Sequence, residues 1–407
     1  MTLASFVRSN AKWLSAGVLL MFLSSPGQTF FISLFAGHIQ TEFNLTHGQW
    51  GGIYSIATFL SAIAMVWAGA LSDVFRARTL GPVVLLLLGL SCIAMATIPV
   101  WWALFAVIFA LRFTGQGMSS HIALVCMSRW FVAARGRALA IATLGFAFGE
   151  ALLPLVFVSL MSVFAWQTLW VFAAIMSFVG IPILLSLLRQ ERTPQSLAKH
   201  SHSTGMKGMN WTRRQTLSHW LFWLMVPPLL GPPAFGTAFF FYQVHYADIK
   251  MIDHVQLVAL YPVYTLISVI AMIGSGWALD RVGTARLIPF MQIPAVLAFA
   301  LLSTAQTTLG IAGGLMCFAL TAGITSTLPA AFWAEFYGTA HLGAIKAMAA
   351  AVMVLGSALG PGLVGTMLDL GIGLERQYVW VAGYFVLTTL MMFLGVGKAR
   401  SLLPLSA

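Results

Sequence analysis

The sequence predicts an all-α polytopic membrane protein with twelve transmembrane helices in two six-helix bundles, and three observations lead to this fold class. The 407 residues are 60% hydrophobic and only 8% charged, whereas about a quarter of the residues in a soluble domain are charged. Apolar stretches long enough to cross a bilayer recur along the whole chain. One long polar interval separates six of these stretches from six others.

A helix needs about 20 apolar residues to cross the hydrocarbon core of a membrane. The first six such stretches lie near residues 13–37, 47–71, 79–99, 102–128, 138–161 and 169–188. The other six lie near residues 217–246, 256–278, 286–304, 308–333, 343–367 and 378–397. The first stretch continues to Ala36 without a small-residue cleavage site, so we expect a retained helix and not a signal peptide.

The polar interval, residues 189–216, is rich in serine, histidine and basic residues, and we expect it to be a cytoplasmic linker. It divides the chain into an N-terminal bundle, 1–188, and a C-terminal bundle, 217–407. Internal similarity supports this division, because "GALSD" closes the second stretch at Asp73 and "GWALD" closes the eighth at Asp280. A weak repeat of this kind is typical of duplicated transporter folds.

A second repeat consists of small residues. The fifth stretch carries Gly145 and Gly149, and the eleventh carries the same G-x-x-x-G spacing at Gly356 and Gly360. Glycines at this spacing let neighbouring helix backbones approach closely. We therefore expect the fifth and eleventh helices to pack tightly against a neighbour.

The net charge of +11 is distributed unevenly. If both termini are cytoplasmic, 18 of the 21 basic residues lie on the cytoplasmic side, and only Lys250 and Arg376 lie outside, with Arg112 inside a helix. This bias predicts the orientation by the positive-inside rule. It also explains the basic composition without a nucleic-acid partner, and we expect the location to be a bacterial inner membrane.

The loops "GALSDVFRAR" and "GWALDRVGTAR" resemble the two copies of the signature loop of the major facilitator superfamily. The resemblance covers the whole chain and implies the twelve-helix fold of that family. It also implies that loop residues cap helix ends and latch the cytoplasmic sides of the two halves together. The implied residues of this cytoplasmic gate are Gly69, Asp73 and Arg78 in the first copy, and Gly276, Asp280, Arg281, Gly283 and Arg286 in the second. Val74 and Arg76 depart from the family pattern, which has an arginine and a glycine there.

A finer resemblance concerns the segment "WFVAARGRALAIATLGFAFG", from Trp130 to Gly149. It is similar to the segment that opens the fifth helix of monocarboxylate porters and their bacterial relatives. Those porters carry an aspartate and an arginine in the eighth helix, whereas the eighth stretch of this chain has no charge within it. The binding site of those porters is therefore not transferred, and the substrate stays open.

Two charged residues lie deep inside expected spans, Arg112 in the fourth and Glu150 in the fifth. Their distances from the span ends, roughly 15 Å and 18 Å, place both near the same depth in antiparallel helices. Two hypotheses follow. The residues form a buried ion pair that joins the two helices, or they line a central cavity where Arg112 binds a substrate anion and Glu150 takes up a proton.

Weaker candidates for substrate binding or coupling accompany this pair. Helical spacing places Gln116 and Ser119 on the face of Arg112. Gln28 follows Pro26 and Gly27 in the first span. From the second half, the possible hydrogen-bonding partners of a substrate are Tyr261, Tyr264 and Thr325.

The seventh span is interrupted in sequence by four prolines, Pro227, Pro228, Pro232 and Pro233, so it is expected to bend as a gate. Beyond them, the segment "FFFYQVHYAD" offers Tyr242, Gln243 and His245. We interpret these three residues as anchors at the membrane interface in preference to ligands, because aromatic belts lie at that depth.

Three functions remain open at this point. The first is a secondary active transporter, a proton symporter for a small organic solute such as an organic anion. The second is a proton-driven efflux antiporter for drugs or metabolites, and the third is a non-transporting membrane sensor. The sequence has no nucleotide-binding loop and no metal-spaced His or Cys set, so we predict no enzymatic activity, no cofactor and no metal. The expected partners are a small-molecule substrate, protons and the lipid bilayer, and the protein is expected to be a monomer.

Overall fold

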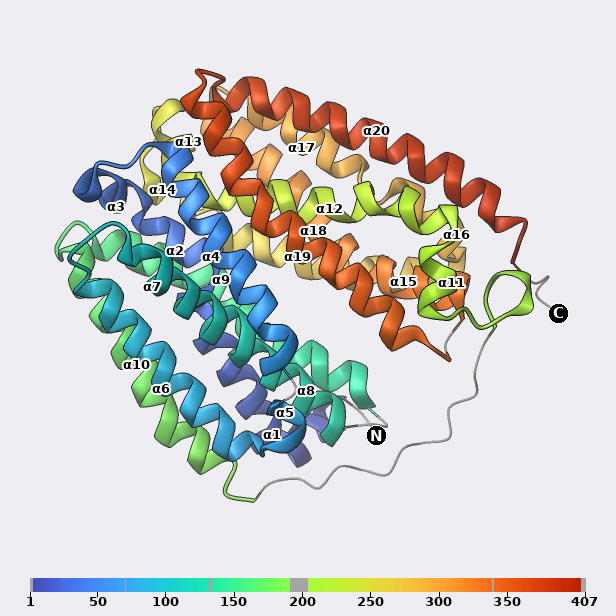
Figure 1. Cartoon of the computed structure of the whole chain (residues 1–407), viewed down its shortest axis with the longest axis horizontal. Helices are drawn as coiled ribbons and strands as arrows, with labels where there is room; N and C mark the ends of the chain where they lie inside the picture. The colour runs from blue at the N-terminus through green and yellow to red at the C-terminus, as the bar shows by residue number, and fades with distance from the viewer. Residues whose placement is uncertain (1–2, 70, 132–133, 191–203, 339, 404–407) are drawn as a thin grey trace. The chain divides into compact units, whose positions relative to one another are not determined.

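The computed structural model describes residues 3–69, 71–131, 134–190, 204–338 and 340–403, and the regular elements among these residues are all helices (Figure 1). The internal contacts divide the chain into two compact units. Unit 1 comprises Met1–Lys199 together with Phe240–His245, and unit 2 comprises His200–Phe239 together with Tyr246–Ala407. Of the expected linker, residues 191–203 lie outside the described part of the chain.

The elements up to residue 190 are α1 (Leu3–Leu23), η1 (Ser25–Gly27), α2 (Thr29–Ile32), η2 (Ser33–Phe35), α3 (Ala36–Phe43), α4 (His47–Ala68), α5 (Leu71–Val74), α6 (Ala77–Ala96), α7 (Ala103–Leu111), η3 (Arg112–Ser119), α8 (Ser120–Trp130), α9 (Arg135–Leu160) and α10 (Trp166–Leu187).

The elements from residue 204 onward are η5 (Met206–Gly208), α11 (Arg213–Leu217), α12 (Trp220–Phe241), α13 (Gln243–Ile249), α14 (His254–Val258), α15 (Tyr261–Val282), α16 (Thr284–Leu287), η6 (Ile288–Phe290), α17 (Ile293–Thr304), α18 (Thr308–Tyr337), α19 (Leu342–Asp369) and α20 (Leu374–Arg400).

The predicted spans agree with these helices. Within the described residues, ten helices are long and apolar enough to cross a membrane, and the bent pair Ser5–Gly27 and Thr29–Phe43 brings the number to eleven. The remaining predicted span, 102–128, is built from three consecutive elements, α7, η3 and α8, each of which is shorter than a membrane span. The chain is a multi-pass membrane protein with the predicted all-α fold class.

The long helices have apolar exposed faces, as expected for helices that contact lipid. In α6, an exposed stripe of Val83, Leu86, Leu87 and Leu90 follows the spacing of one helix face, whereas the opposite face buries Leu85 and Leu88. Each unit also has its own apolar core of buried side chains. A helix that is apolar all round and buried on only one face is expected to present its other face to lipid.

The helices pair in the same way in both units. In unit 1, α1 packs on α9 and α6 lies beside α10, and in unit 2 α17 lies beside α20 (Figure 1). The G-x-x-x-G glycines explain one equivalent pair. Gly145 lies against the backbone of Val18 in α1, and Gly360 lies against the backbone of Ala234 in α12. Because neither glycine has a Cβ, each pair of helices approaches at backbone distance.

Replacing Gly145 by Ala should lower the melting temperature of the purified protein. The new Cβ would overlap the carbonyl oxygen of Val18, and overpacking of this kind costs about 1–3 kcal/mol. Gly136→Ala is the matched control in the same helix, since no atom lies within 4 Å of a Cβ at that position. That control should be neutral or stabilising by up to about 1 kcal/mol. Equal effects of the two substitutions would contradict the close packing of α9 on α1.

The prolines of α12 do not break it, because the helix continues from Trp220 to Phe241 with all four prolines inside. Pro232 has no N–H for the carbonyl of Pro228, and the side-chain amide of Gln292 donates to that carbonyl instead. The Oε1 atom of Gln292 then accepts a hydrogen bond from Thr388 at 2.6 Å. A buried polar network thus satisfies the freed carbonyl, so the helical segment is not interrupted. A bend of α12 that acts as a gate stays a prediction.

Candidate functional site: a buried arginine in unit 1

The fourth predicted span contains a π-helix, η3, which begins at Arg112. A π-helix bonds residue i to residue i+5, so it holds more residues per turn than an α-helix, and it is rare and frequent at functional sites. The wider turn changes which side chains share a face. Ser119 is buried and donates to the carbonyl of Leu20 at 2.8 Å, whereas Gln116 is exposed. The α-helical spacing that grouped Arg112 with Gln116 and Ser119 therefore does not describe this segment.

The first span is broken opposite this π-helix. After α1 ends at Leu23, the short η1 contains Pro26 and Gly27, and the chain resumes as a helix at Thr29 with a bend of 45°. A Cβ on Gly115 in η3 would lie only 2.7 Å from the Cα of Gly27. The two irregular segments therefore meet backbone to backbone, and only glycine permits this approach.

The guanidinium of Arg112 occupies this junction. Its Nη1 donates to the carbonyl of Gly27 at 3.1 Å and to Oγ1 of Thr29 at 3.3 Å. Thr29 in turn lies 2.6 Å from the hydroxyl of Tyr54, and the guanidinium carbon lies 5.2 Å from the centre of the Tyr54 ring. The break in the first span thus supplies a carbonyl that no helical N–H uses, and the arginine takes it.

The Nε atom of the guanidinium has no acceptor among the described residues. Arg112 is 2% exposed, and its Nε is buried without a hydrogen-bond partner. No ion pair joins Arg112 to Glu150 in the part of the chain that the structure describes. Glu150 lies half-buried in α9, next to Gly149, whose Cα faces Ser25 in η1. The pair that would join the fourth and fifth spans is therefore not formed.

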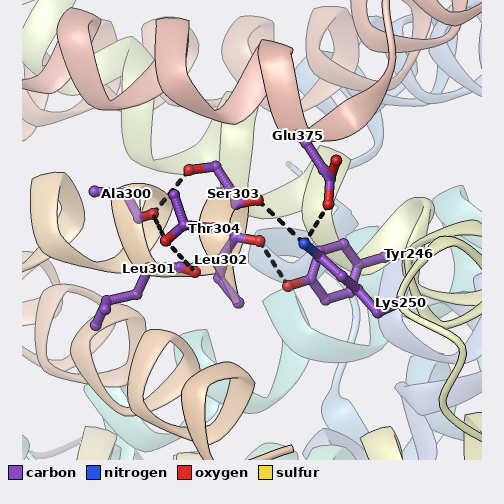
Figure 2. A network of polar contacts seen from close by, with 8 residues as sticks. All are labelled: Tyr246, Lys250, Ala300, Leu301, Leu302, Ser303, Thr304 and Glu375. Carbon is purple, nitrogen blue, oxygen red and sulfur yellow. Dashed lines mark hydrogen bonds and ion pairs between the residues drawn. The ribbon is translucent and has the colours of Figure 1, made fainter. Parts of the chain in front are cut away.

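The buried lysine of unit 2, Lys250, has a carboxylate partner, in contrast to Arg112. Arg112 and Lys250 are the two buried Lys or Arg side chains among the described residues. The ammonium of Lys250 donates to the carbonyl of Ser303 at 3.1 Å and forms an ion pair with Glu375 (Figure 2). Beside it, Tyr246 donates to the carbonyl of Leu302 at 2.9 Å. Burial raises the pKa of the Tyr246 hydroxyl and the Glu375 carboxylate raises it further, so this hydroxyl stays a donor.

Glu375→Gln should destabilise the protein by about 1–2 kcal/mol. Removing one partner of a fully buried pair costs about 3–5 kcal/mol, and we reduce this figure because half of the Glu375 side chain is exposed. The same substitution at the exposed Glu335 is the control, and the double variant Lys250→Met/Glu375→Gln should recover most of the loss. Thermal unfolding in detergent measures all three, and a double variant no more stable than Glu375→Gln would contradict the ion-pair explanation.

The segment Phe240–His245, which we call the cover segment, packs over the Arg112 site within unit 1. The ring of Phe241 lies 4.5 Å from that of Tyr54. The side chain of Gln243 is fully buried and donates to Oγ of Ser33 at 2.7 Å and to the carbonyl of Phe30 at 3.2 Å.

The rest of the cover segment is attached to the start of α4. The hydroxyl of Tyr242 donates to the carbonyl of His47 at 3.0 Å, and the ring of His245 lies 4.3 Å from that of His47. Tyr242 and Gln243 are therefore bonded inside the protein, and their interpretation as anchors in the membrane interface was wrong.

Of the other predicted binding residues, Gln28 lies in unit 1 and three lie in unit 2. Gln28 is buried at the helix break and donates to Oγ of Ser24 at 3.2 Å, so it stabilises the break beside the site. Tyr261 and Tyr264 are buried in unit 2. Thr325, also in unit 2, donates to the carbonyl of Thr321 in its own helix at 2.7 Å.

The first predicted gate loop is stabilised by residues that the sequence analysis did not single out. Gly69 ends α4, and its carbonyl accepts from Ser72 at 2.8 Å and lies 3.1 Å from Nε2 of His121. Arg129 donates to the carbonyl of Ser72 at 2.8 Å. Arg78 donates to the carbonyl of Arg189 at 3.3 Å. The side chain of Asp73 lies outside the described part of the structure.

In the second loop, Gly283 ends α15 with φ of +81°, a conformation that favours glycine. Arg281 lies over the ring of Trp277 at 4.1 Å, and Arg286 is exposed in α16. Gly276 lies inside α15 with the methyl group of Thr327 3.9 Å from its Cβ position. The side chain of Asp280 also lies outside the described residues.

Sequence reasoning missed Thr29 and Tyr54, the side chains that complete the arginine site. The "SPG" motif at Ser25–Gly27 gives a signal for the helix break, and a break marks the nearest freed carbonyls as hydrogen-bond acceptors. Nothing in the sequence marks Tyr54, which is one polar aromatic residue inside a long apolar helix.

Comparisons with known proteins agree on one fold. A sequence model described as the Major Facilitator Superfamily matches residues 17–361. No curated protein sequence matches the chain. Among solved structures, a bacterial homologue of the human lysosomal transporter Spinster is 14% identical with a TM-score of 0.73, covering 98% of this chain and 99% of that one. The nucleoside transporter NupG, in a mutant form, is 15% identical with a TM-score of 0.72, covering 94% and 99%. The human organic anion transporter MFSD10 is 14% identical with a TM-score of 0.64, covering 94% and 99%.

Proposed function

Because this chain belongs to the Major Facilitator Superfamily, we propose that it is a secondary active transporter that moves a small organic anion by alternating access, coupled to protons. Family membership and the membrane spans make the chain a multi-pass membrane transporter and not an enzyme. The anion, the coupling to protons and the residues responsible are the proposal.

The observation that carries the proposal is the uncompensated charge of Arg112. A buried cation without a countercharge is costly, and the other buried cation, Lys250, has its carboxylate. Nη1 of Arg112 is used by Gly27 and Thr29, which fixes the plane of the guanidinium. Its Nε side can donate two parallel hydrogen bonds to a carboxylate, the geometry for which arginine is suited. The cargo would thus supply the missing negative charge.

Access to this arginine requires movement of the cover segment. Tyr54 lies against the guanidinium, and Phe241 covers Tyr54. The cover segment is attached by the hydrogen bonds of Tyr242 and Gln243 to backbone and hydroxyl groups, which can exchange for water when the segment leaves. We propose that its release opens the site to one side of the membrane, as one step of alternating access between the bundles 1–188 and 217–407.

Proton coupling is assigned to Glu150. It is a carboxylate inside a span, and ionisable groups at this depth usually serve a substrate or ion pathway. It lies on α9 beside glycines that pack on α1 and η1, and η1 also supplies the Gly27 carbonyl that accepts from Arg112. Binding of an anion at Arg112 would change the electrostatic environment of Glu150 and favour uptake of a proton.

The proposed setting follows from the charge distribution. We propose a bacterial inner membrane with both termini and the linker, 189–216, in the cytoplasm, according to the positive-inside rule. The protein would act as a monomeric symporter, with a small molecule and protons as its partners. The first gate loop and the second, through Gly283 and Arg286, would close the cytoplasmic side.

A ligand screen tests the proposal. Purified protein is heated with matched pairs of compounds, such as benzoate and benzamide or glutarate and glutaramide, together with amino acids and cationic drugs. A ligand at 100 times its Kd stabilises a protein by about 2.7 kcal/mol. We expect carboxylates to raise the melting temperature and their neutral amides to have no effect. Stabilisation by amides or cationic drugs in place of carboxylates would contradict an anion site and favour the efflux alternative.

A further inference from the structure

A second, separate group of cations lines two hollows in unit 1, where α1 begins, α6 begins and α10 ends. One hollow, of about 640 Å³, is lined by Arg76, Arg78, Thr79, Pro82, Leu185 and Arg189. The other, of about 530 Å³, includes Arg8, Lys12, Trp13 and Arg189 in its lining. Arg189 lines both hollows, so the two adjoin and together carry five Lys or Arg side chains, Arg8, Lys12, Arg76, Arg78 and Arg189. No Asp or Glu is among the described residues that line either hollow.

This surface has a fixed scaffold. The chain just after α10 is attached on both sides, because Arg78 donates to the carbonyl of Arg189 at 3.3 Å and Trp13 donates to the carbonyl of Gln190 at 2.8 Å. Three helices that are distant in sequence are therefore tied together at one point. The arrangement sets Arg189 between the basic residues of α1 and those at the start of α6.

The lining changes from cationic to apolar in the direction of the spans. Pro82 in α6 and Leu185 in α10 line the first hollow, and both helices are long and apolar enough to cross the membrane. Trp13, in the second hollow, is of the residue type that marks the interface between lipid and water. The hollows therefore lie at the depth of lipid headgroups, with an apolar wall below the charges.

We propose that this surface binds the phosphate of an anionic glycerophospholipid, with the phosphate between Arg189 and its neighbouring cations and the acyl chains along Leu185 and Pro82. Basic pockets between membrane helices on the cytoplasmic side are suited to anionic headgroups. The apolar wall favours a lipid over free phosphate, because acyl chains can bury apolar surface against it and inorganic phosphate cannot. The hollow volumes lie in the range of about 300–1,000 Å³ typical of small-ligand pockets. The bound lipid would add negative charge among the cations and hold α1, α6 and α10 together.

Native mass spectrometry of the purified full chain tests this proposal with phosphatidylglycerol, with phosphatidylcholine of the same acyl chains, and with inorganic phosphate. The wild type should bind phosphatidylglycerol most tightly. Lys12→Gln/Arg189→Gln should weaken this binding about 30-fold, from the loss of two surface charges. The control Arg213→Gln/Arg214→Gln removes two charges from α11 and should change the affinity less than about threefold. Equal losses in both double variants, or inorganic phosphate binding as tightly as phosphatidylglycerol, would overturn the proposal.

A photo-crosslinking measurement on the wild type does not depend on the variants. Phosphatidylglycerol with a photoreactive headgroup should label peptides that contain residues 8–13 or 185–190. Labels confined to other parts of the chain would overturn the site. Because neither experiment involves the cargo, failure here and failure of the carboxylate screen are distinguishable.

Discussion

Arg112→Lys should weaken carboxylate binding about 10- to 150-fold. Lysine keeps the positive charge but presents one ammonium in place of the two parallel N–H groups of arginine. A hydrogen bond to a charged group contributes about 1.5–3 kcal/mol, which corresponds to that range of affinity. The measurement is a titration of wild type and variant with the carboxylate that stabilises the protein most in the screen. Arg213→Lys, an exposed position in α11, is the matched control and should bind as the wild type does.

The stability of the ligand-free variant separates a binding role from a structural one. Arg112→Met removes a buried charge that has no carboxylate partner among the described residues. Replacing an uncompensated buried charge by an apolar side chain removes its desolvation penalty. The carbonyl of Gly27 then loses its donor, at a cost of about 1–3 kcal/mol, which offsets this gain. The empty Arg112→Met variant should therefore melt close to the temperature of the wild type while failing to bind carboxylates. A clear fall in its melting temperature would indicate that Arg112 holds the fold together.

Glu150→Gln should abolish uphill uptake in proteoliposomes with an imposed pH gradient and leave counterflow exchange measurable. Glutamine has nearly the shape of glutamate and can still accept a hydrogen bond, but it cannot take up or release a proton. Exchange needs only the movement of loaded carrier, whereas accumulation needs the proton. The labelled probe is again the most stabilising carboxylate.

Glu335→Gln is the control for this experiment, because Glu335 is exposed on α18 and the substitution is the same. It should accumulate the probe as the wild type does. Uphill uptake that persists in Glu150→Gln would remove Glu150 from the coupling mechanism. Loss of both uptake and exchange would mean that Glu150 serves cargo binding or structure and not the proton.

The sequence was sufficient for the membrane fold because hydrophobic length is a strong signal. Eleven of the predicted spans coincide with helices or a bent pair that are long and apolar enough to cross a membrane. The tight packing predicted from the glycines was also correct, since Gly145 and Gly360 meet neighbouring backbones. Both features can be predicted from short stretches of sequence. A membrane span needs a minimum length of apolar residues, and a close helix contact needs glycine.

The candidate site was less predictable because its geometry depends on irregular backbone. The α-helical period predicts one face for Arg112, Gln116 and Ser119, but in the π-helix Ser119 is buried against Leu20 while Gln116 is exposed, and nothing in their composition reveals it. The expected partner of Arg112 was a carboxylate, whereas Nη1 bonds the carbonyl of Gly27. Backbone carbonyls are present at every residue, so only the structure shows which one is free.

The prolines of α12 interrupt its helix less than their number suggests. Four prolines in one span predict an interruption of the helix, but Gln292 satisfies the freed carbonyl of Pro228 and the helix continues. One proline in the first span, Pro26, with Gly27 beside it, accompanies the actual break. The number of prolines therefore did not decide where a helical segment is interrupted, since neighbouring side chains can replace the missing hydrogen bonds.

The structure of the protein with its most stabilising carboxylate bound tests the central claim most directly. The account predicts both carboxylate oxygens at about 3 Å from the nitrogens on the Nε side of Arg112, with Nη1 still bonded to the carbonyl of Gly27. A carboxylate bound elsewhere, with Nε of Arg112 still without an acceptor or paired with Glu150, would contradict it.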